Sequence, residues 1–447
     1  MLKNLKYKIV TYGCQMNKAD SERIEALLDL NGFECASKAE DADLILINTC
    51  SVRQTAEDRV YGAIYNFSKL KKKKPHLLLG VTGCMAGRDK NGAIRNKFFS
   101  ALNNGGIKGG PIDLFFEITD LPKLPEMIAE KWKNKTVGSL APYSKKMGYL
   151  GIVPKPAEWW RGCVVIQTGC SKYCTYCVVP YARGSEKNRS LGAVLKEART
   201  LVKKGAKEII LLGQAVNSHP KFAEILKKIN QIEGVNRTSF ASAHPMHMTP
   251  DVIRALALSK VVNYLHLPVQ SGNDEVLRKM NRNYTREKYL QIIRRIRKVR
   301  PDIALATDII VGFPGETRKQ FQDTVSLYKK CDFDLSYNAI YSPRTGTSAY
   351  KAFKDDVSRE EKRRRWRVLQ ELMERNVLRK NKKYFNQTVE VLVDGCRAGN
   401  CYGLSREYKR VVFKGDKRLI GEIVNVKIIK AKEWELNGEI TNYEYEK

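Results

Sequence analysis

Three cysteines lie close together in the middle of the chain, in the run Cys170-Ser-Lys-Tyr-Cys174-Thr-Tyr-Cys177. Thiolates at this C-x3-C-x2-C spacing can hold three corners of an iron–sulfur cube and leave the fourth iron open to a small molecule. A zinc site would need a fourth Cys or His, but no His lies in this region and Cys163 has an irregular spacing. The run therefore predicts an iron–sulfur site with one open iron.

Three further cysteines, Cys14, Cys50 and Cys84, each follow an apolar run that predicts a β-strand. The runs are KIVTYG, ADLILINTC and HLLLGVTGC, with helical patterns over residues 21–31 and from about residue 55 between them. Strands that alternate with helices predict a parallel sheet, and ligands gather beyond the carboxyl ends of such strands. We therefore expect these thiols to converge at one sheet edge. The alternative is a place in the core, which would put them inside the strands.

The remaining elements predict an α/β protein with a small all-β domain. Residues 86–112 read as an inserted loop, DLFFEITDLPKLPEMI as the last strand and helix of an open parallel sheet, and residues 133–156 as a linker. Strands and helices alternate again from Val164 to about Asp334, which predicts a partial (β/α) barrel with its active residues at the strand ends. A basic helix over residues 358–384 leads to short β pieces typical of an antiparallel barrel. The expected domains are 1–140, 156–385 and 386–447.

Composition constrains the partners. The 447 residues include 80 Lys+Arg against 48 Asp+Glu, a net charge of +32, which favours a polyanion such as nucleic acid unless the whole proteome is lysine-rich. No uncharged apolar run approaches the ~18 residues of a membrane span, and the first residues carry no signal-peptide pattern. We therefore expect a cytoplasmic protein with no membrane partner. Its 11 cysteines then favour metal ligation or catalysis over disulfides.

Taken together, the two cysteine sets resemble the radical S-adenosylmethionine (SAM) methylthiotransferases, and the resemblance covers nearly the whole chain. The matching pieces are TYGCQMN with Asp20-Ser21-Glu22, NTCSVR, TGCMA, GCSKYCTYCVVPYARGSEKNRS, LLGQAVNS, LHLPVQSGNDEVLRKMNRNYTREKY, TDIIVGFPGET and YSPRTGTSA. The C-terminal segment with GLSREYKRVVFKG resembles the RNA-binding TRAM module. The family usually has Asn where this chain has Ala215, and it has no counterpart for Cys163, Cys396 and Cys401, which we expect to be small packing residues.

The resemblance implies SAM and two 4Fe–4S clusters as cofactors. Its catalytic and metal-binding cysteines would be Cys14, Cys50 and Cys84 for an auxiliary cluster, and Cys170, Cys174 and Cys177 for the radical SAM cluster. Reductive cleavage of SAM would give a 5′-deoxyadenosyl radical that takes hydrogen from C2 of an adenine, and that carbon would then receive the methylthio group. The cofactor-binding residues implied by the family are Tyr176, Gly213, Gln214, Gln270, Ser271, Asp308 and Gly312.

TYGCQMN and MNRNYTREKY are most similar to the branch that acts on N6-dimethylallyladenosine next to the tRNA anticodon, on its 3′ side. The implied partners are a tRNA anticodon stem-loop and an electron donor such as flavodoxin or ferredoxin. Two alternatives keep the chemistry but place it on threonylcarbamoyladenosine in tRNA or on a ribosomal protein side chain, and Gln15-Met16-Asn17 is the feature that bears on them. A third is an iron–sulfur RNA-binding protein without turnover.

Positive charge locates the expected RNA contacts. From Asn386 on, 11 Lys/Arg face 10 Asp/Glu, so the helices at 282–300 and 359–383 are the better candidates for phosphate contacts. On the barrel, Arg406, Lys409, Arg410 and Phe413 are the candidates, with stacking expected from Phe413. The alternative is a solvated strand face with Phe413 in the core.

Overall fold

The computed structural model describes residues 5–51, 54–89, 91–100, 111–133 and 148–441. It divides into two compact units, each with its own core. Unit 1 contains residues 1–157, 168–173 and 177–187, and unit 2 contains residues 158–167, 174–176 and 188–447. Among the described helices, none combines the length and the apolarity that crossing a bilayer requires.

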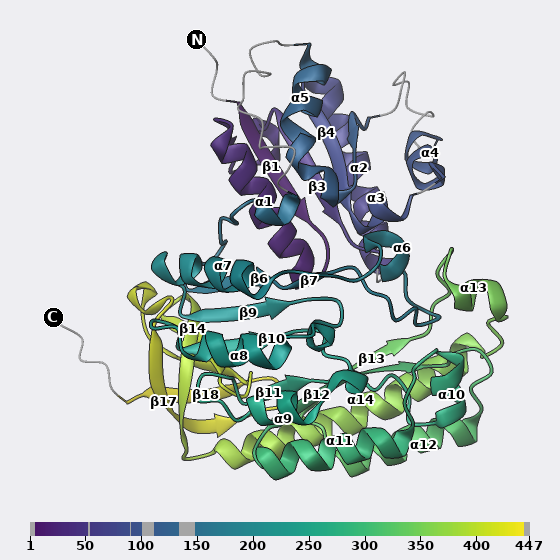
Figure 1. The fold of residues 1–447 in the computed structure, drawn as a ribbon, viewed down its shortest axis with the longest axis vertical. Helices are drawn as coiled ribbons and strands as arrows, with labels where there is room; N and C mark the ends of the chain where they lie inside the picture. Colours follow the sequence, from purple (N-terminus) through teal and green to yellow (C-terminus); the bar gives the residue numbers. More distant parts are fainter. Residues whose placement is uncertain (1–4, 52–53, 90, 101–110, 134–147, 442–447) are drawn as a thin grey trace. The chain divides into compact units, whose positions relative to one another are not determined.

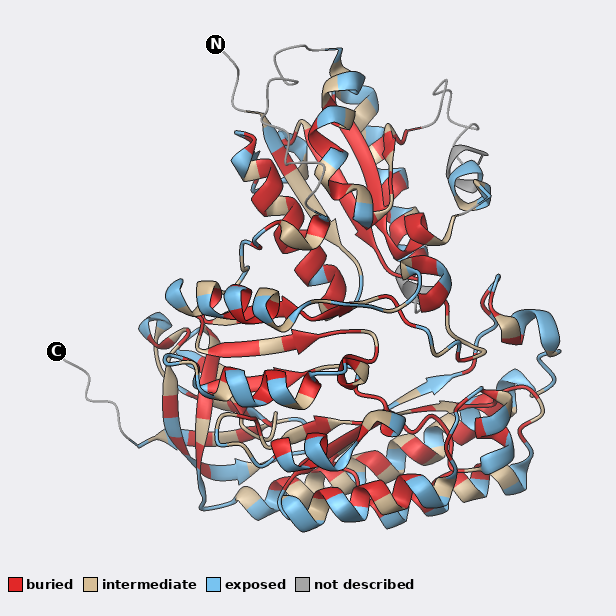
Figure 2. Cartoon of the chain, in the orientation of Figure 1, coloured by how far each residue is buried: buried red, intermediate tan, exposed pale blue. Residues whose placement is uncertain are grey.

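A five-stranded parallel sheet organises unit 1, in the order β2-β1-β3-β4-β5. Figure 1 labels its three central strands, β1, β3 and β4. Its strands are β1 (Lys6–Thr11), β2 (Glu34–Cys35), β3 (Leu44–Thr49), β4 (Leu78–Gly83) and β5 (Leu114–Phe115). Central β3 and β4 are buried along their whole length (Figure 2), as their unbroken runs LILINT and LLGVTG lead one to expect for strands covered on both faces. The predicted open parallel sheet is confirmed.

Helices cover both faces of this sheet. Leu44 and Leu46 pack with residues of α1 and α5, whereas Ile45 and Ile47 pack with α2, because successive strand side chains point to opposite faces. The helices of unit 1 are α1 (Gln15–Leu30), α2 (Gln54–Lys73), α3 (Cys84–Arg88), α4 (Ala93–Ser100), α5 (Leu124–Trp132) and α6 (Val179–Arg183), with 3-10 turns η1 (Ala39–Asp41), η3 (Ile118–Lys123) and η5 (Tyr149–Gly151).

Two boundary predictions for unit 1 were wrong. α1 begins directly after Cys14, six residues before the predicted start, because Cys14 itself is its N-cap. Residues 86–112 are not a plain loop, since they contain the end of α3 and all of α4, while 101–110 lie outside the described residues.

Unit 2 contains two three-stranded parallel sheets, in the orders β10-β9-β6 and β11-β12-β13, linked by one bridge between Thr238 and Val261. Their strands are β6 (Arg161–Val165), β9 (Glu208–Leu212), β10 (Arg237–Phe240), β11 (Tyr264–His266), β12 (Ala304–Val311) and β13 (Leu335–Ile340). β7 (Gln167–Thr168) and β8 (Lys187–Asn188) form a separate two-stranded sheet. This arrangement fits the predicted partial barrel.

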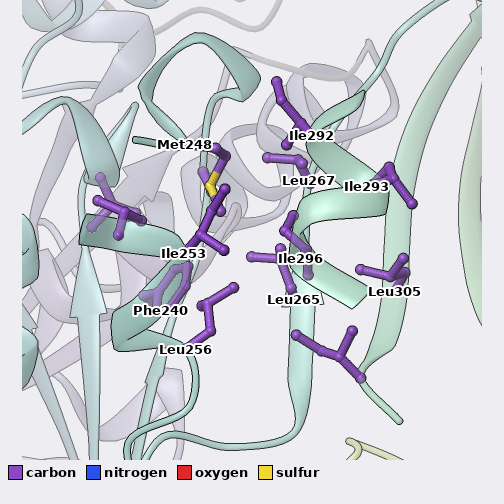
Figure 3. Close-up of a cluster of buried hydrophobic side chains, with 14 of the residues drawn as sticks. Phe240, Met248, Ile253, Leu256, Leu265, Leu267, Ile292, Ile293, Ile296 and Leu305 are labelled. Atoms are coloured by element: carbon purple, nitrogen blue, oxygen red, sulfur yellow. The ribbon is translucent and has the colours of Figure 1, made fainter. Parts of the chain in front are cut away.

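Several helices of unit 2 bury apolar side chains against its strands. In α11, the apolar side chains repeat at helical spacing from Tyr289 to Ile296, and Ile292, Ile293 and Ile296 pack toward Leu265 and Leu305 of the strands (Figure 3). The helices and turns are α7 (Leu191–Lys203), α8 (Phe222–Asn230), α9 (Pro250–Ala255), α10 (Asp274–Lys279), α11 (Arg286–Val299), α12 (Arg318–Cys331), α13 (Ser348–Ala352), α14 (Arg359–Asn381), η6 (Val216–Ser218), η7 (Pro245–His247), η8 (Lys382–Tyr384) and η9 (Lys417–Leu419).

The C-terminal strands close into a barrel in the order β14-β15-β16-β18-β17, as predicted. The barrel is not wholly antiparallel, however, because β16 and β18 pair in parallel while the other neighbouring strands pair antiparallel. They are β14 (Thr388–Arg397), β15 (Asn400–Ser405), β16 (Arg410–Lys414), β17 (Ile423–Ala431) and β18 (Leu436–Ile440). The sequence analysis missed β15.

One expectation about the cysteines was also wrong. Cys396 and Cys401 are not separate packing residues but are joined by a disulfide. The β14–β15 register places them directly opposite each other, which a reading without β15 could not reveal. Cys163 is a buried residue of β6.

Candidate iron–sulfur sites

The ends of β3 and β4 set two of the N-terminal cysteines at the same level. Thr49 pairs with Gly83 across the two strands, so the residues that follow, Cys50 and Cys84, leave the sheet together. Neighbouring strands lie roughly 4.8 Å apart. Both thiols are buried, with 4% of each residue exposed.

Gly13 brings the loop of Cys14 against this pair. Its φ of +151° belongs to a region that favours glycine, and a β-carbon built on it would lie 3.0 Å from the Cβ of Cys50. Cys14 is exposed and caps the N-terminus of α1, and Cys84 is the first residue of α3. The structure thus places all three cysteines at one sheet edge, with two of them at helix N-termini.

Two asparagines frame this edge. Asn17 donates from Nδ2 to Asn48 Oδ1 over 3.2 Å and to the Thr49 carbonyl over 3.0 Å. Asn48 Nδ2 in turn donates to the Asn17 carbonyl over 2.8 Å. Both side chains are fully buried, so they tie the first turn of α1 to the end of β3. The sequence analysis connected Asn17 with the acceptor, whereas these bonds give it a structural role.

Arg183 of α6 contacts the same edge and was missed by the sequence analysis. Its Nε donates to Cys84 Sγ over 3.3 Å, and its Nη2 donates to Asp20 Oδ2 over 2.7 Å. Burial lowers the pKa of Arg183, but the charges of Asp20 and Cys84 outweigh burial and raise the pKa well above its usual value. A buried guanidinium therefore stays charged beside a candidate cluster thiolate. The sequence contains a signal for Arg183, because this residue lies in the stretch VVPYARGSE that resembles the family.

α3 and α6 approach each other at backbone distance. A β-carbon built on Gly87 would lie 2.0 Å from the carbonyl oxygen of Ala182, closer than any real contact allows. Gly87 is therefore required for the approach that brings Arg183 to Cys84.

Cys170 and Cys177 also belong to unit 1, where backbone bonds hold their loop. The Cys170 N–H donates to the Gly184 carbonyl over 3.0 Å. The Val179 N–H donates to Cys177 Sγ over 3.4 Å, and hydrogen bonds of this kind to ligating sulfurs influence the potential of a cluster.

Cys174 belongs to unit 2, together with Thr175 and Tyr176. Thr175 donates from its N–H to the Met280 carbonyl over 3.1 Å and from its hydroxyl to the Lys279 carbonyl over 2.8 Å. Tyr176 packs against a buried cluster that includes Met280. Arg282, which we had counted among the phosphate-binding helix residues, is instead buried and donates to Cys174 Sγ over 3.5 Å.

Among the described residues, no three His, Cys, Asp or Glu side chains are grouped tightly enough to hold a single metal ion. An iron–sulfur cube makes a different demand, because each thiolate binds a separate iron at its own corner. The three strand-end thiols and the buried cation at Cys84 fit such a group.

Several of the expected cofactor-binding residues lie at successive strand ends of unit 2. Gly213 and Gln214 follow β9, and the Gln270 N–H donates to the Asp308 carbonyl of β12 over 2.8 Å. Gln270 has a φ of +70°, which is unusual for a residue other than glycine. Asp308 Oδ1 is 2.9 Å from His266 Nε2. The structure thus brings Gln270 and Asp308 together.

Ser271 and Gly312 have structural explanations of their own. Ser271 is fully buried, and its hydroxyl lies 3.4 Å from that of Thr324. The Gly312 N–H donates to Glu316 Oε2 over 2.7 Å, and a β-carbon built on Gly312 would lie 2.3 Å from Cγ of Lys362. Neither the side chain nor the backbone of Ser271 is exposed, so the structure shows no surface of this residue for a cofactor contact.

The prediction of RNA contacts was wrong for most of the barrel residues. Phe413 is 2% exposed and forms part of the barrel core, so the stacking prediction was wrong. Lys409 is buried against Asp334, with 3.2 Å between Nζ and Oδ1, and Arg406 donates to the Val261 carbonyl over 3.1 Å. Arg410 is exposed, 4.9 Å above the Tyr402 ring.

These residues are held within the protein because the turn before β16 packs on β9 and β11 of unit 2. Tyr408 donates to Glu208 Oε1 over 2.8 Å and stacks on Tyr264, with ring centroids 4.7 Å apart. This turn is therefore part of an internal interface of unit 2. On α14, Arg363, Arg367 and Arg375 are exposed and have no hydrogen bond or ion pair within the described part of the chain, as phosphate contacts require.

Comparison with protein families defines the class. Residues 164–328 match the Radical SAM superfamily, residues 6–102 match the Uncharacterized protein family UPF0004, and residues 382–441 match the TRAM domain. The chain is therefore a radical SAM protein, which binds a 4Fe–4S cluster and SAM, and it carries an RNA-binding TRAM domain.

Full-length relatives define the family. The chain is 41% identical to the tRNA-2-methylthio-N(6)-dimethylallyladenosine synthase of Clostridium botulinum, over 96% of both chains. It is 40% identical to the enzyme of the same name from Geobacillus thermodenitrificans, over 98% of this chain and 84% of the relative. It belongs to this family of transferases.

Solved structures agree at the level of the fold. The radical SAM methyltransferase TsrM from Kitasatospora setae superposes with a TM-score of 0.55 at 14% identity, covering 78% of this chain and 75% of TsrM. The cobalamin-dependent SAM radical enzyme OxsB gives a TM-score of 0.52 at 12% identity, covering 84% of this chain and 61% of OxsB.

Proposed function

We propose that this chain inserts a methylthio group at C2 of N6-dimethylallyladenosine, 3′-adjacent to the anticodon of tRNA. The activity for which its full-length relatives are named supports this substrate. The single observation that carries the chemistry is the sheet edge with Cys14, Cys50 and Cys84, because sulfur insertion needs a sulfur source separate from SAM.

In this proposal, the strand-end thiols hold an auxiliary 4Fe–4S cluster, and Cys170, Cys174 and Cys177 hold the radical SAM cluster. When bound, the two clusters and SAM supply the electron, the carbon radical chemistry and the sulfur. The protein supplies geometry and charge. Asn17 and Asn48 hold the loop of Cys14 in place, and Arg183 provides positive charge and a hydrogen bond at Cys84.

SAM binding is assigned to Tyr176 and to the strand ends of unit 2. Gln270 and Asp308 are the best-supported members, because a backbone bond joins them and the Asp308 carboxylate keeps about a third of its surface exposed. Gly213 and Gln214 lie at the end of β9, and Ser271 and Gly312 complete the set that the family resemblance implies. These residues would orient the cofactor and exclude water from it.

The proposed tRNA contacts are chosen by their exposed positive charge. Arg410 and the exposed arginines of α14 are the proposed phosphate contacts, and Phe413, Lys409 and Arg406 are withdrawn because each is held within the protein. A flavodoxin or ferredoxin is the proposed electron donor.

Anaerobic iron and sulfide analysis with electron paramagnetic resonance (EPR) tests the cluster assignment. Two four-iron clusters require about eight irons per wild-type chain. The triple variants Cys14→Ala/Cys50→Ala/Cys84→Ala and Cys170→Ala/Cys174→Ala/Cys177→Ala should each retain about four. If the wild type holds about four irons, all lost with the second variant, the auxiliary cluster and sulfur insertion are both rejected.

The acceptor is tested separately with the reconstituted enzyme, SAM and a reductant. We expect a methylthio product with tRNA that carries dimethylallyladenosine. Matched reactions use the same tRNA without the dimethylallyl group, a threonylcarbamoyladenosine tRNA, and ribosomal protein. Product in one of the last two reactions alone would reassign the substrate while preserving the chemistry.

A further inference from the structure

We propose that Arg282 is the counter-charge of the radical SAM cluster and raises the potential at which that cluster accepts an electron. The inference deepens the proposed function, because it rests on Cys174 being a ligand of that cluster. Arg282 acts on the cluster through the Cys174 sulfur, so we call it a positioning residue and not a catalytic residue.

The first argument is the environment of the guanidinium. Arg282 is 7% exposed, and its three described side-chain partners are Cys174 Sγ, the Pro268 carbonyl and the Tyr284 hydroxyl. Within the described residues it has no carboxylate partner. A buried charge is costly unless an opposite charge compensates for it. Of the three partners, Cys174 is the one that bears a negative charge once it ligates iron.

Tyr284 does not supply the missing charge. Burial raises its pKa to about 12, and its hydroxyl donates to the Val269 carbonyl over 2.8 Å. The phenol therefore keeps its proton and serves as a neutral acceptor for Arg282 Nε, 2.9 Å away.

The second argument is that the local fold fixes this geometry. The turn after α10 passes through Asn281, whose φ of +56° redirects the chain just before Arg282. Thr175, next to Cys174, is bonded to Lys279 and Met280 of the same turn. The Ala349 N–H donates to the Thr175 carbonyl over 2.7 Å. Cys174 and Arg282 are therefore held on two segments that are bonded directly to each other.

The electrostatic consequence has a definite sign. A cluster gains one negative charge when it accepts an electron, so a fixed positive charge at a ligating sulfur stabilises the reduced form. Net charge and hydrogen bonds to the sulfurs are among the factors that set cluster potentials. Loss of Arg282 should therefore make the cluster harder to reduce.

The test is an EPR-monitored redox titration of the full-length protein in the Cys14→Ala/Cys50→Ala/Cys84→Ala background, which isolates this cluster. At the midpoint potential of the parent, Arg282→Gln should lower the ratio of reduced to oxidised cluster about tenfold, which is 59 mV for one electron. Arg282→Lys should restore most of the ratio because it keeps the charge. The matched control is Arg278→Gln, which removes a charge from an exposed residue nearby and should leave the ratio unchanged.

A ratio in Arg282→Gln within about twofold of the parent overturns the proposal, since the charge would then have no effect on the potential. Loss of iron in Arg282→Gln but not in Arg282→Lys supports it. Loss of iron in both overturns it in favour of a purely structural guanidinium, because lysine keeps the charge. If the parent itself binds no iron at Cys170, Cys174 and Cys177, the proposed function fails, which is distinct from failure of this inference alone.

Discussion

In each cysteine set a buried arginine donates to one of the thiols, Arg183 to Cys84 and Arg282 to Cys174, but the two arginines are balanced differently. Arg183 donates both to Cys84 and to the carboxylate of Asp20, so its charge is already compensated within unit 1. Arg282 donates to Cys174 and otherwise to neutral oxygens. We infer that Arg183 mainly stabilises the frame around its site, whereas the charge of Arg282 is left to act on the group that Cys174 holds.

Among the variants that test this difference, the largest effect on stability is expected from Arg183→Met. Removing one partner of a buried ion pair leaves Asp20 uncompensated and should lower the free energy of unfolding by about 3–5 kcal/mol. Arg282→Met in the cluster-free protein should cost clearly less, because no buried carboxylate loses its partner. Denaturant unfolding of both cluster-free variants measures the difference. Equal losses of unfolding free energy in the two variants would contradict the proposed difference between the two arginines.

A smaller effect is expected from Gly87→Ala. The new methyl group cannot fit 2.0 Å from the Ala182 carbonyl, so α3 and α6 must separate, at a cost of about 1–3 kcal/mol. The auxiliary cluster should lose iron while the radical SAM cluster keeps its own. The matched control is Gly62→Ala on α2, where a β-carbon meets nothing within 4 Å. That substitution should stabilise the helix by roughly 0.5–1 kcal/mol.

The smallest effect is expected at the Cys174 site, from Thr175→Val. It removes the hydroxyl bond to the Lys279 carbonyl and should cost about 0.5–1.5 kcal/mol of stability. Because both backbone bonds of Thr175 remain, Cys174 should stay near Arg282. The redox titration should then give the parent midpoint potential. A large shift would show that the Arg282–Cys174 geometry depends on this single hydroxyl.

Much of the fold followed from local patterns. Apolar strands that alternate with helices predicted both parallel regions, and the short β pieces predicted the closed barrel. The strand-end positions of Cys14, Cys50 and Cys84 predicted the edge at which the structure places them. The start of α1 and the strand β15 were missed, because capping and hairpin pairing depend on contacts that periodicity does not encode.

The barrel residues that were predicted to contact RNA illustrate the opposite case. Lys409 and Phe413 lie in a basic, aromatic stretch, which is as compatible with an internal interface as with an RNA contact. Tertiary packing decided between the two, burying Phe413 in the barrel and pairing Lys409 with Asp334, 75 residues away in the sequence.

The sequence by itself therefore predicted the chemistry, because cysteine spacing and the succession of strands along the chain are local properties. The tertiary structure alone decided which charges act on those cysteines. Arg183 lies 99 residues from Cys84, and Arg282 lies 108 residues from Cys174. Over such separations nothing in the local pattern pairs a guanidinium with a thiol, and the pairing is made by the packing of α6 on α3 in one unit and by the bonded turn after α10 in the other.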